Sequence, residues 1–124
     1  MSDVTSTVDI YLSMLNETDP ANRAGLVERA WAPGGRWVDP PIEAEGHAAI
    51  SDMVAAVHTQ FPGHVFRRVS GIDAHHDQLR FAWELVGPDG SVAVAGIDVG
   101  ELAPDGRLRR ITGFIGELPQ ETAA

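Results

Sequence analysis

Three polar side chains occupy positions where the sequence pattern predicts an apolar environment. Tyr11 falls on the apolar stripe of a helix-like segment near the N-terminus. Asp39 closes a short extended segment and stands directly before two prolines. Asp98 lies in the middle of a long apolar strand pattern, where no turn or helix cap accounts for it. Small residues beside Asp98 leave space around its carboxyl group, so these three side chains are the candidates for chemistry.

A carboxyl group in such surroundings has a predictable charge state. Without a charged partner, burial disfavours the carboxylate, and the group tends to keep its proton. A protonated acid (Asp98) and a phenol (Tyr11) can both donate hydrogen bonds to an oxyanion that develops on a substrate. A second, ionised carboxylate (Asp39) could then move a proton.

Each of these residues also has a structural explanation that the sequence leaves open. Tyr11 could be a core tyrosine whose hydroxyl group binds a backbone carbonyl. Asp39 could be a turn residue that bonds to its own backbone. Asp98 could be buried against an arginine as a structural ion pair.

The elements that must position these residues begin with three helices. Apolar residues at i, i+3, i+4 and i+7 predict the first helix over residues 8–15. Asp19-Pro20 predicts the start of a second helix, which runs to Trp31 and is ended by Pro-Gly-Gly. A short extended segment over residues 36–39 follows. The third helix carries an apolar face over residues 50–61 and ends at Pro-Gly.

After the third helix the apolar period changes from 3.6 to 2, which is typical of strands. Alternation predicts a strand over residues 79–85, and two glycine-containing turns delimit further strands over residues 91–102 and 107–118. Helices followed by antiparallel strands indicate an α+β fold with the helices on one side of the sheet. The last residues, 120–124, read as a frayed tail.

The strand over residues 91–102 is apolar on both faces, whereas a half-exposed strand should have one polar face. Something must therefore cover the outer face of the sheet. A second copy of the chain is the simplest cover, so we predict a homodimer formed through this face.

Composition limits the classes of function. The chain has 124 residues, a length that fits one domain, and it has no cysteine. Its formal charge of −9 argues against nucleic acid and anionic membranes as partners. All nine basic residues are arginine. No segment has the pattern of a signal peptide or a membrane helix, so we expect a cytoplasmic protein.

Several motifs, taken together, resemble one protein family. They are Tyr11-Leu12, the turn to Asp19, Val38-Asp39-Pro40, Glu45-Gly46-His47, Gly96-Ile97-Asp98-Val99 and Asp105-Gly106-Arg107-Leu108. This series is similar to the landmarks of the nuclear transport factor 2-like superfamily, in particular the ketosteroid isomerases and the SnoaL-like polyketide cyclases. The resemblance covers nearly the whole chain and implies one domain over residues 1–124, with a core from about 8 to 118.

The resemblance implies a fold and a mechanism. The fold would be a cone-shaped, curved antiparallel sheet that encloses one pocket with three N-terminal helices, a cystatin-like α+β roll. In steroid isomerases a tyrosine on the first helix and a protonated aspartic acid on a late strand form the oxyanion hole, and an aspartate at the end of the first strand is the base. Carried over, these residues are Tyr11, Asp98 and Asp39. This enzyme is also a known example of a carboxylic acid kept neutral by its apolar site.

We therefore expect a pocket for a small apolar ligand that carries a carbonyl group, such as a steroid or polyketide. The expected reaction proceeds by enolisation and uses no cofactor or metal. The expected pocket residues are Trp31, Trp37, Met53, Val57, His58, Phe61, Phe81, Trp83 and Ile115. Isomerisation and ring closure would both follow from an enolate. Two alternatives stay open: a non-catalytic ligand-binding or accessory domain, and hydrolysis of an epoxide by paired carboxylates.

Overall fold

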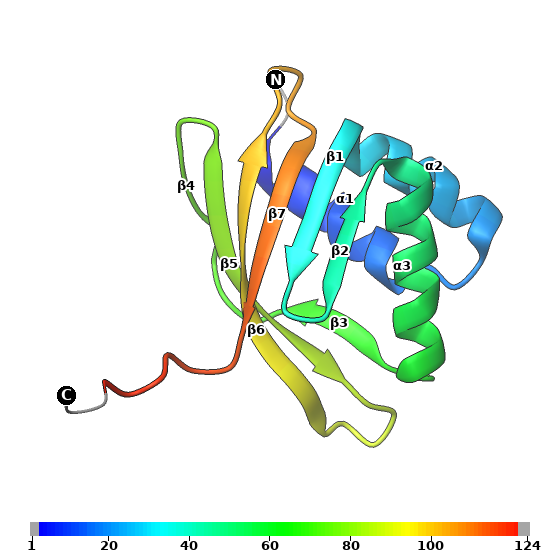
Figure 1. The fold of residues 1–124 in the computed structure, drawn as a ribbon, viewed down its shortest axis with the longest axis vertical. Coiled ribbons are helices and arrows are strands. Elements are labelled where there is room, and N and C mark those ends of the chain that lie inside the picture. Colours follow the sequence, from blue (N-terminus) through cyan, green and yellow to red (C-terminus); the bar gives the residue numbers. More distant parts are fainter. Residues whose placement is uncertain (1–2, 122–124) are drawn as a thin grey trace.

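A computed structural model describes residues 3–121 of the chain (Figure 1). Two helices open it, a strand hairpin separates them from the third helix, and five strands follow. The elements are α1 (Val4–Asn16), α2 (Pro20–Ala30), β1 (Trp31–Asp39), β2 (Ile42–Glu45), α3 (His47–Gln60), β3 (Val65–Arg68), β4 (Asp73–His75), β5 (Gln78–Val86), β6 (Val92–Leu102) and β7 (Leu108–Ile115). The α+β class expected from the sequence is confirmed.

All seven strands formed by residues 3–121 belong to one curved sheet. Its order is β2-β1-β7-β6-β5-β3, and β4 pairs with β5 beside this path. Every pairing is antiparallel except that of β1 with β7, which is parallel. Because β1 joins the sheet beside the last strand, residues from the first and last thirds of the chain become neighbours.

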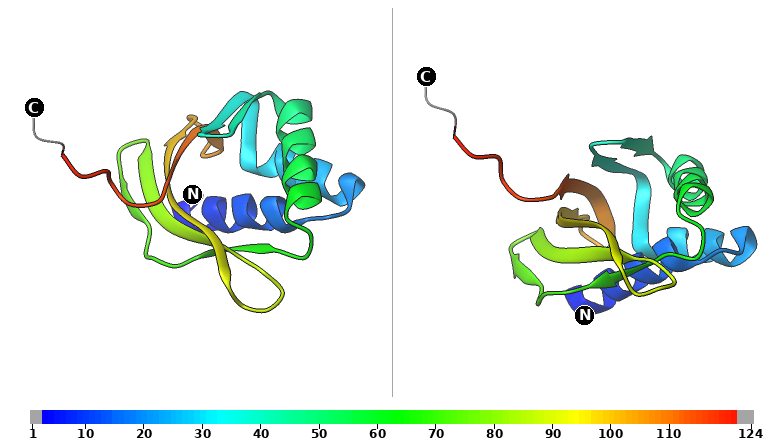
Figure 2. Two further views of the ribbon diagram at one scale, coloured as in Figure 1. Left: turned by 60° about the horizontal axis from the view of Figure 1, so that its bottom comes forward. Right: turned by 90° about the horizontal axis from the view of Figure 1, so that it is seen from below.

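The helices lie against the concave side of this sheet (Figure 2). Helix α1 packs on α2 and β3, and α3 packs on β1 and β2. Asn16, at the end of α1, receives a 2.7 Å hydrogen bond from the backbone N–H of Phe66 and donates one of 2.8 Å to the carbonyl of Phe66. These two bonds fix the end of α1 on β3. The sheet therefore curls around α1, and α3 closes the remaining side.

The largest difference from the sequence prediction is at the start of β1. Trp31 was expected to end the second helix, but it is the first residue of β1 and is fully buried. The Pro-Gly-Gly that follows lies inside the strand, where the register with β7 shifts. The indole of Trp31 packs directly against the backbone of Gly35. A Cβ atom at position 35 would lie only 2.5 Å from Cε3 of Trp31, so this packing requires glycine there.

The core lies between the helices and the concave face of the sheet. Its fully buried side chains come from both ends of the chain and include Tyr11, Met14, Trp31, Ile50, Leu79, Leu108 and Ile111. The opposite face of β6 and β7 carries an exposed apolar pair. Ile97 and Phe114, which are directly paired across these strands, are 46% and 62% exposed.

None of the helices formed by residues 3–121 has the length and apolar character that crossing a membrane would require.

Candidate functional site

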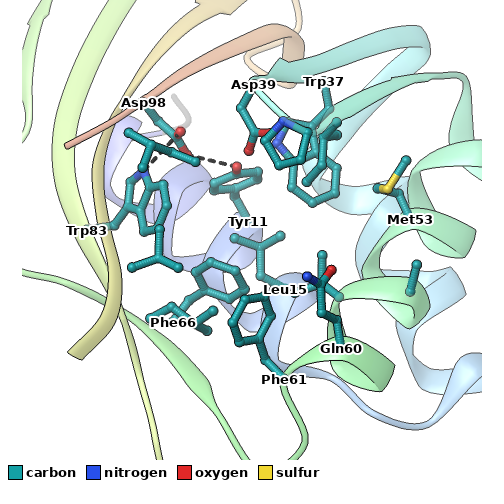
Figure 3. A pocket seen from close by; sticks show the side chains of 17 residues that line it. Tyr11, Leu15, Trp37, Asp39, Met53, Gln60, Phe61, Phe66, Trp83 and Asp98 are labelled. Carbon is teal, nitrogen blue, oxygen red and sulfur yellow. Dashed lines mark hydrogen bonds between the residues drawn. The ribbon is translucent and has the colours of Figure 1, made fainter. Parts of the chain in front are cut away.

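An apolar pocket of about 190 Å³ opens between α1, α3 and the sheet (Figure 3). Its polar end is formed by Tyr11 on α1, Asp39 at the end of β1 and Asp98 on β6. The two carboxyl groups and the phenol point toward the same end of the cavity. The structure thus brings together the three residues that the sequence singled out for chemistry.

Asp98 is almost entirely buried, at 4% exposure, and both of its oxygens accept hydrogen bonds. The hydroxyl group of Tyr11 donates to Oδ2 at 2.8 Å, and the indole Nε1 of Trp83 donates to Oδ1 at 3.0 Å. Within residues 3–121, no arginine forms an ion pair with Asp98. The partners of this carboxyl group are therefore two neutral donors that also line the pocket.

The indole of Trp83 reaches Asp98 because of the glycine opposite it. Trp83 on β5 pairs with Gly96 on β6, two residues before Asp98 on the same face. A Cβ atom at position 96 would lie 2.7 Å from Cζ2 of Trp83. Any side chain at this position would displace the indole, so Gly96 lets Trp83 lie across β6 and donate to the carboxyl group.

Asp39 lies on the other side of β7 from Asp98, and a second glycine makes room between them. Gly113 pairs with Asp98, and a Cβ atom on it would lie 2.9 Å from both Cβ of Asp39 and Oδ1 of Asp98. Asp39 is partly buried, and its Oδ1 has no hydrogen-bond partner among the described residues. The carboxyl groups therefore flank a position where any side chain other than glycine would crowd both.

Burial governs the charge state of all three groups. It raises the pKa of Asp98 from 3.8 to about 6, against the opposing effect of the hydrogen bonds from Tyr11 and Trp83. It raises the pKa of Asp39 from 3.8 to about 6, against a hydrogen bond from the backbone amide of Ile42. Burial, and then the charge of Asp98, raise the pKa of the Tyr11 hydroxyl well above 10.

The remaining expected pocket residues divide into two groups. Six line the pocket: Trp37, Met53, Val57, Phe61, Trp83 and Ile115. Three lie elsewhere. Trp31 and Phe81 are buried in the core, where each ring meets that of Tyr11 edge-on. His58 faces α1 instead, with Nε2 2.7 Å from the carbonyl oxygen of Leu15.

Other lining residues were not anticipated from the sequence. They are Leu15, Pro41, Ile42, Ala56, Gln60, Phe66, Leu85 and Val94. Leu15 lies one helical turn after Tyr11 on the same stripe, so helical spacing alone could have identified it. Phe66 and the β1–β2 turn carry no such signal because they reach the pocket only through the packing of the sheet.

The two histidines near the β4–β5 turn, His75 and His76, belong to no metal site in the described part of the chain. The Nδ1 atoms of His75 and His76 are 3.1 Å apart, and both side chains are exposed. Within residues 3–121, no group of three or more His, Cys, Asp or Glu side chains is arranged to hold a metal ion.

The fold and the order of these elements match solved structures. A protein from Agrobacterium tumefaciens, named as a presumed isomerase of the SnoaL-like family, superposes with a TM-score of 0.88 and 36% sequence identity. The match covers 94% of this chain and 100% of that chain. The chain belongs to the SnoaL-like family.

More distant structures share the fold of this SnoaL-like protein. A presumed SnoaL-like polyketide cyclase from Jannaschia has a TM-score of 0.68 at 19% identity, over 93% of this chain and 89% of that one. A protein of unknown function with a cystatin-like fold from Methylobium petroleophilum has a TM-score of 0.74 at 19% identity. The match covers 98% of this chain and 80% of that chain. No family model and no curated protein matches the sequence.

Proposed function

We propose that this SnoaL-like protein is an enzyme that enolises a small, mostly apolar carbonyl compound, as an isomerase or a cyclase would. One observation carries the proposal. Two carboxyl groups whose pKa values are both raised to about 6 flank Gly113 at the end of an apolar pocket, and one of them bonds to the hydroxyl group of Tyr11. Perturbed carboxyl groups paired in a pocket are typical of acid–base sites.

The two acids would have different roles. Asp98 is the more deeply buried, so it keeps the proton and donates a hydrogen bond to the substrate oxygen. The hydroxyl group of Tyr11, which donates to Oδ2 of Asp98 in the free protein, turns to the same substrate oxygen when the substrate binds. Asp39 is only partly buried and has an unpaired oxygen, so it is the ionised base. Its carboxylate takes a proton from the carbon beside the carbonyl group. The C–H electron pair becomes the C=C bond of the enolate, and the π electron pair of the carbonyl group moves to the oxygen. The same carboxyl group then returns the proton to carbon.

The test is exchange of the α-protons of cyclohexanone in D₂O, followed by NMR. Wild-type protein should accelerate the exchange, and Asp39→Asn should reduce this acceleration by about 100-fold or more, as expected for loss of a general base. Binding of 4-methylphenol, a mimic of the enol, should change little because Asp39 acts on the proton and not on the oxygen.

The matched control is Asp52→Asn, which removes an exposed carboxyl group on α3 that does not line the pocket. This variant should exchange protons at the wild-type rate. Equal exchange in wild type and Asp39→Asn would remove Asp39 from the mechanism. Binding of 4-methylphenol without any exchange by the wild type would favour a ligand-binding domain over an enzyme.

We also propose that the protein forms a homodimer through the outer face of β6 and β7. Ile97 and Phe114 form an exposed apolar pair there, and exposed Ala95 extends the patch along β6. A second copy of the same face would bury these side chains around a two-fold axis. Light scattering at micromolar concentration should give twice the monomer mass.

A further inference from the structure

We infer that the ligand of this pocket is a neutral compound of a single ring, with a carbonyl or hydroxyl oxygen at one end and a second hydrogen-bonding group at the opposite end. The inference rests on the proposed function, since it concerns the same pocket. It narrows that function to a class of ligand much smaller than a steroid, and it assigns a role in specificity to Gln60.

The volume of the cavity sets the size of the ligand. The pocket is open to solvent on one side and has a volume of about 190 Å³. A cavity of about 150 Å³ lined by aliphatic and aromatic side chains accommodates benzene, whereas pockets for drug-sized molecules begin at about 300 Å³. One ring with a few substituent atoms therefore fills the space. A compound of four fused rings would leave most of its surface outside.

The lining residues set the charge of the ligand. Asp39 and Asp98 are the carboxyl groups of the pocket, and no arginine or histidine of the described chain lines it. An anionic ligand would meet like charge in a site of low dielectric constant and would find no cation to pair with. A cationic ligand would hold both carboxylates ionised and remove the acid that binds the substrate oxygen. A neutral ligand avoids both penalties.

Gln60 sets the chemistry of the far end. It is the last residue of α3, exposed to solvent, and it lies across the cavity from Asp39 and Asp98 (Figure 3). Its side chain lines the pocket, so its amide group can exchange solvent for a ligand and offers it both a donor and an acceptor. Leu15 lies between the two ends and forms an apolar wall, and Phe61 lies at the far end beside Gln60. A ring packed against Leu15 could present one polar group to each end.

The first test uses calorimetry with two ring compounds that differ only at the far end, 4-(hydroxymethyl)phenol and 4-methylphenol. Gln60→Leu should shift the ratio of their dissociation constants about fivefold in favour of 4-methylphenol, the effect of one neutral hydrogen bond. The control is Thr59→Val, which changes the neighbouring exposed residue outside the pocket and should leave the ratio unchanged. An unchanged ratio in Gln60→Leu would overturn the role of Gln60.

The second test measures size and charge on the wild-type protein. Estradiol, 4-hydroxybenzoate and benzylamine should each bind at least about tenfold more weakly than 4-(hydroxymethyl)phenol. The inference is overturned if any of the three binds as tightly, or if no single-ring phenol binds. Because calorimetry requires no reaction, tight binding of the phenol without proton exchange would remove the enolisation mechanism and leave the ligand class standing.

Discussion

The charge state of Asp98 can be tested in the free protein through Asp98→Asn. The amide keeps the shape of the side chain and removes its titration. Its oxygen can still accept from Nε1 of Trp83, and its N–H group can donate to the hydroxyl oxygen of Tyr11, whose own O–H then loses its acceptor. That loss costs the same free energy at every pH. The pH-dependent part of the effect is therefore the cost of holding a carboxylate in this site.

The size of the effect follows from the pKa of the buried group. Folding raises the pKa of Asp98 from 3.8 to about 6, so the native state binds the proton more tightly than the unfolded chain does. The stability that this proton contributes is complete below pH 3.8 and is lost as the pH rises to about 6. At about 1.36 kcal/mol per pKa unit, the loss is about 3 kcal/mol for a side chain that is 4% exposed. Asp98→Asn has no titrating group at this position, so its free energy of unfolding does not show this loss.

The assay is denaturant unfolding of both proteins between pH 3.5 and about 8. The difference in the free energy of unfolding, variant minus wild type, should rise by about 3 kcal/mol across this range and level off above pH 7. Asp105→Asn is the control with the opposite sign. Hydrogen bonds from the backbone amide and the side chain of Arg107 lower the pKa of Asp105, so its contribution is lost as the pH falls.

A constant destabilisation by Asp98→Asn at every pH would refute the reasoning. That result would mean that the native protein holds Asp98 as a hydrogen-bonded carboxylate of ordinary pKa. Tyr11 and Trp83 would then be its structural donors, and the acid that the proposed mechanism needs would be absent.

Four further outcomes are expected. The rate of α-proton exchange should follow a bell-shaped pH profile centred near pH 6, because Asp39 must be ionised while Asp98 is protonated; a profile flat from pH 5 to 8 would contradict this. Trp83→Phe should raise the pKa of Asp98 further, which NMR titration of its carboxyl carbon would report; a pKa that stays or falls would show that the indole N–H is not an effective donor. Gly113→Ala should destabilise the fold by about 1–3 kcal/mol in thermal unfolding, since its Cβ crowds both carboxyl groups; wild-type stability would mean the site relaxes. Phe114→Arg should yield monomers by light scattering, and a monomeric wild type would remove the dimer altogether.

Much of the local structure was determined by the sequence. Asp19-Pro20 marks the start of α2, and Pro62-Gly63 follows the end of α3, because caps and breakers act within a few residues. Alternation over residues 79–85 identified β5, and the two glycine-containing turns delimited β6. The period of two along β6 places Asp98 on the same face as Val94, Gly96 and Gly100. Because both faces of this strand are apolar, the sequence did not show which of them is buried.

The partners of each site residue were decided only by the tertiary structure. Periodicity tells which face of an element is buried, but not which strand lies beside it or in which register. The parallel pairing of β1 with β7 brings Asp39 next to Gly113, and the pairing of β5 with β6 places Trp83 against Gly96, within reach of Asp98.

The same limit explains the residues that were misplaced or missed. The periodicity of α3 and the strands could not separate side chains that reach the cavity from those that pack below it. His58 faces the backbone of α1, and Phe81 fills the core beside Tyr11, whereas Gln60 and Phe66 reach the pocket. The sequence therefore singled out Asp39 and Asp98 as carboxyl groups in apolar surroundings. Only the packing of α1 and α3 against the curved sheet decided what surrounds them, because that cavity is formed by segments far apart in the chain.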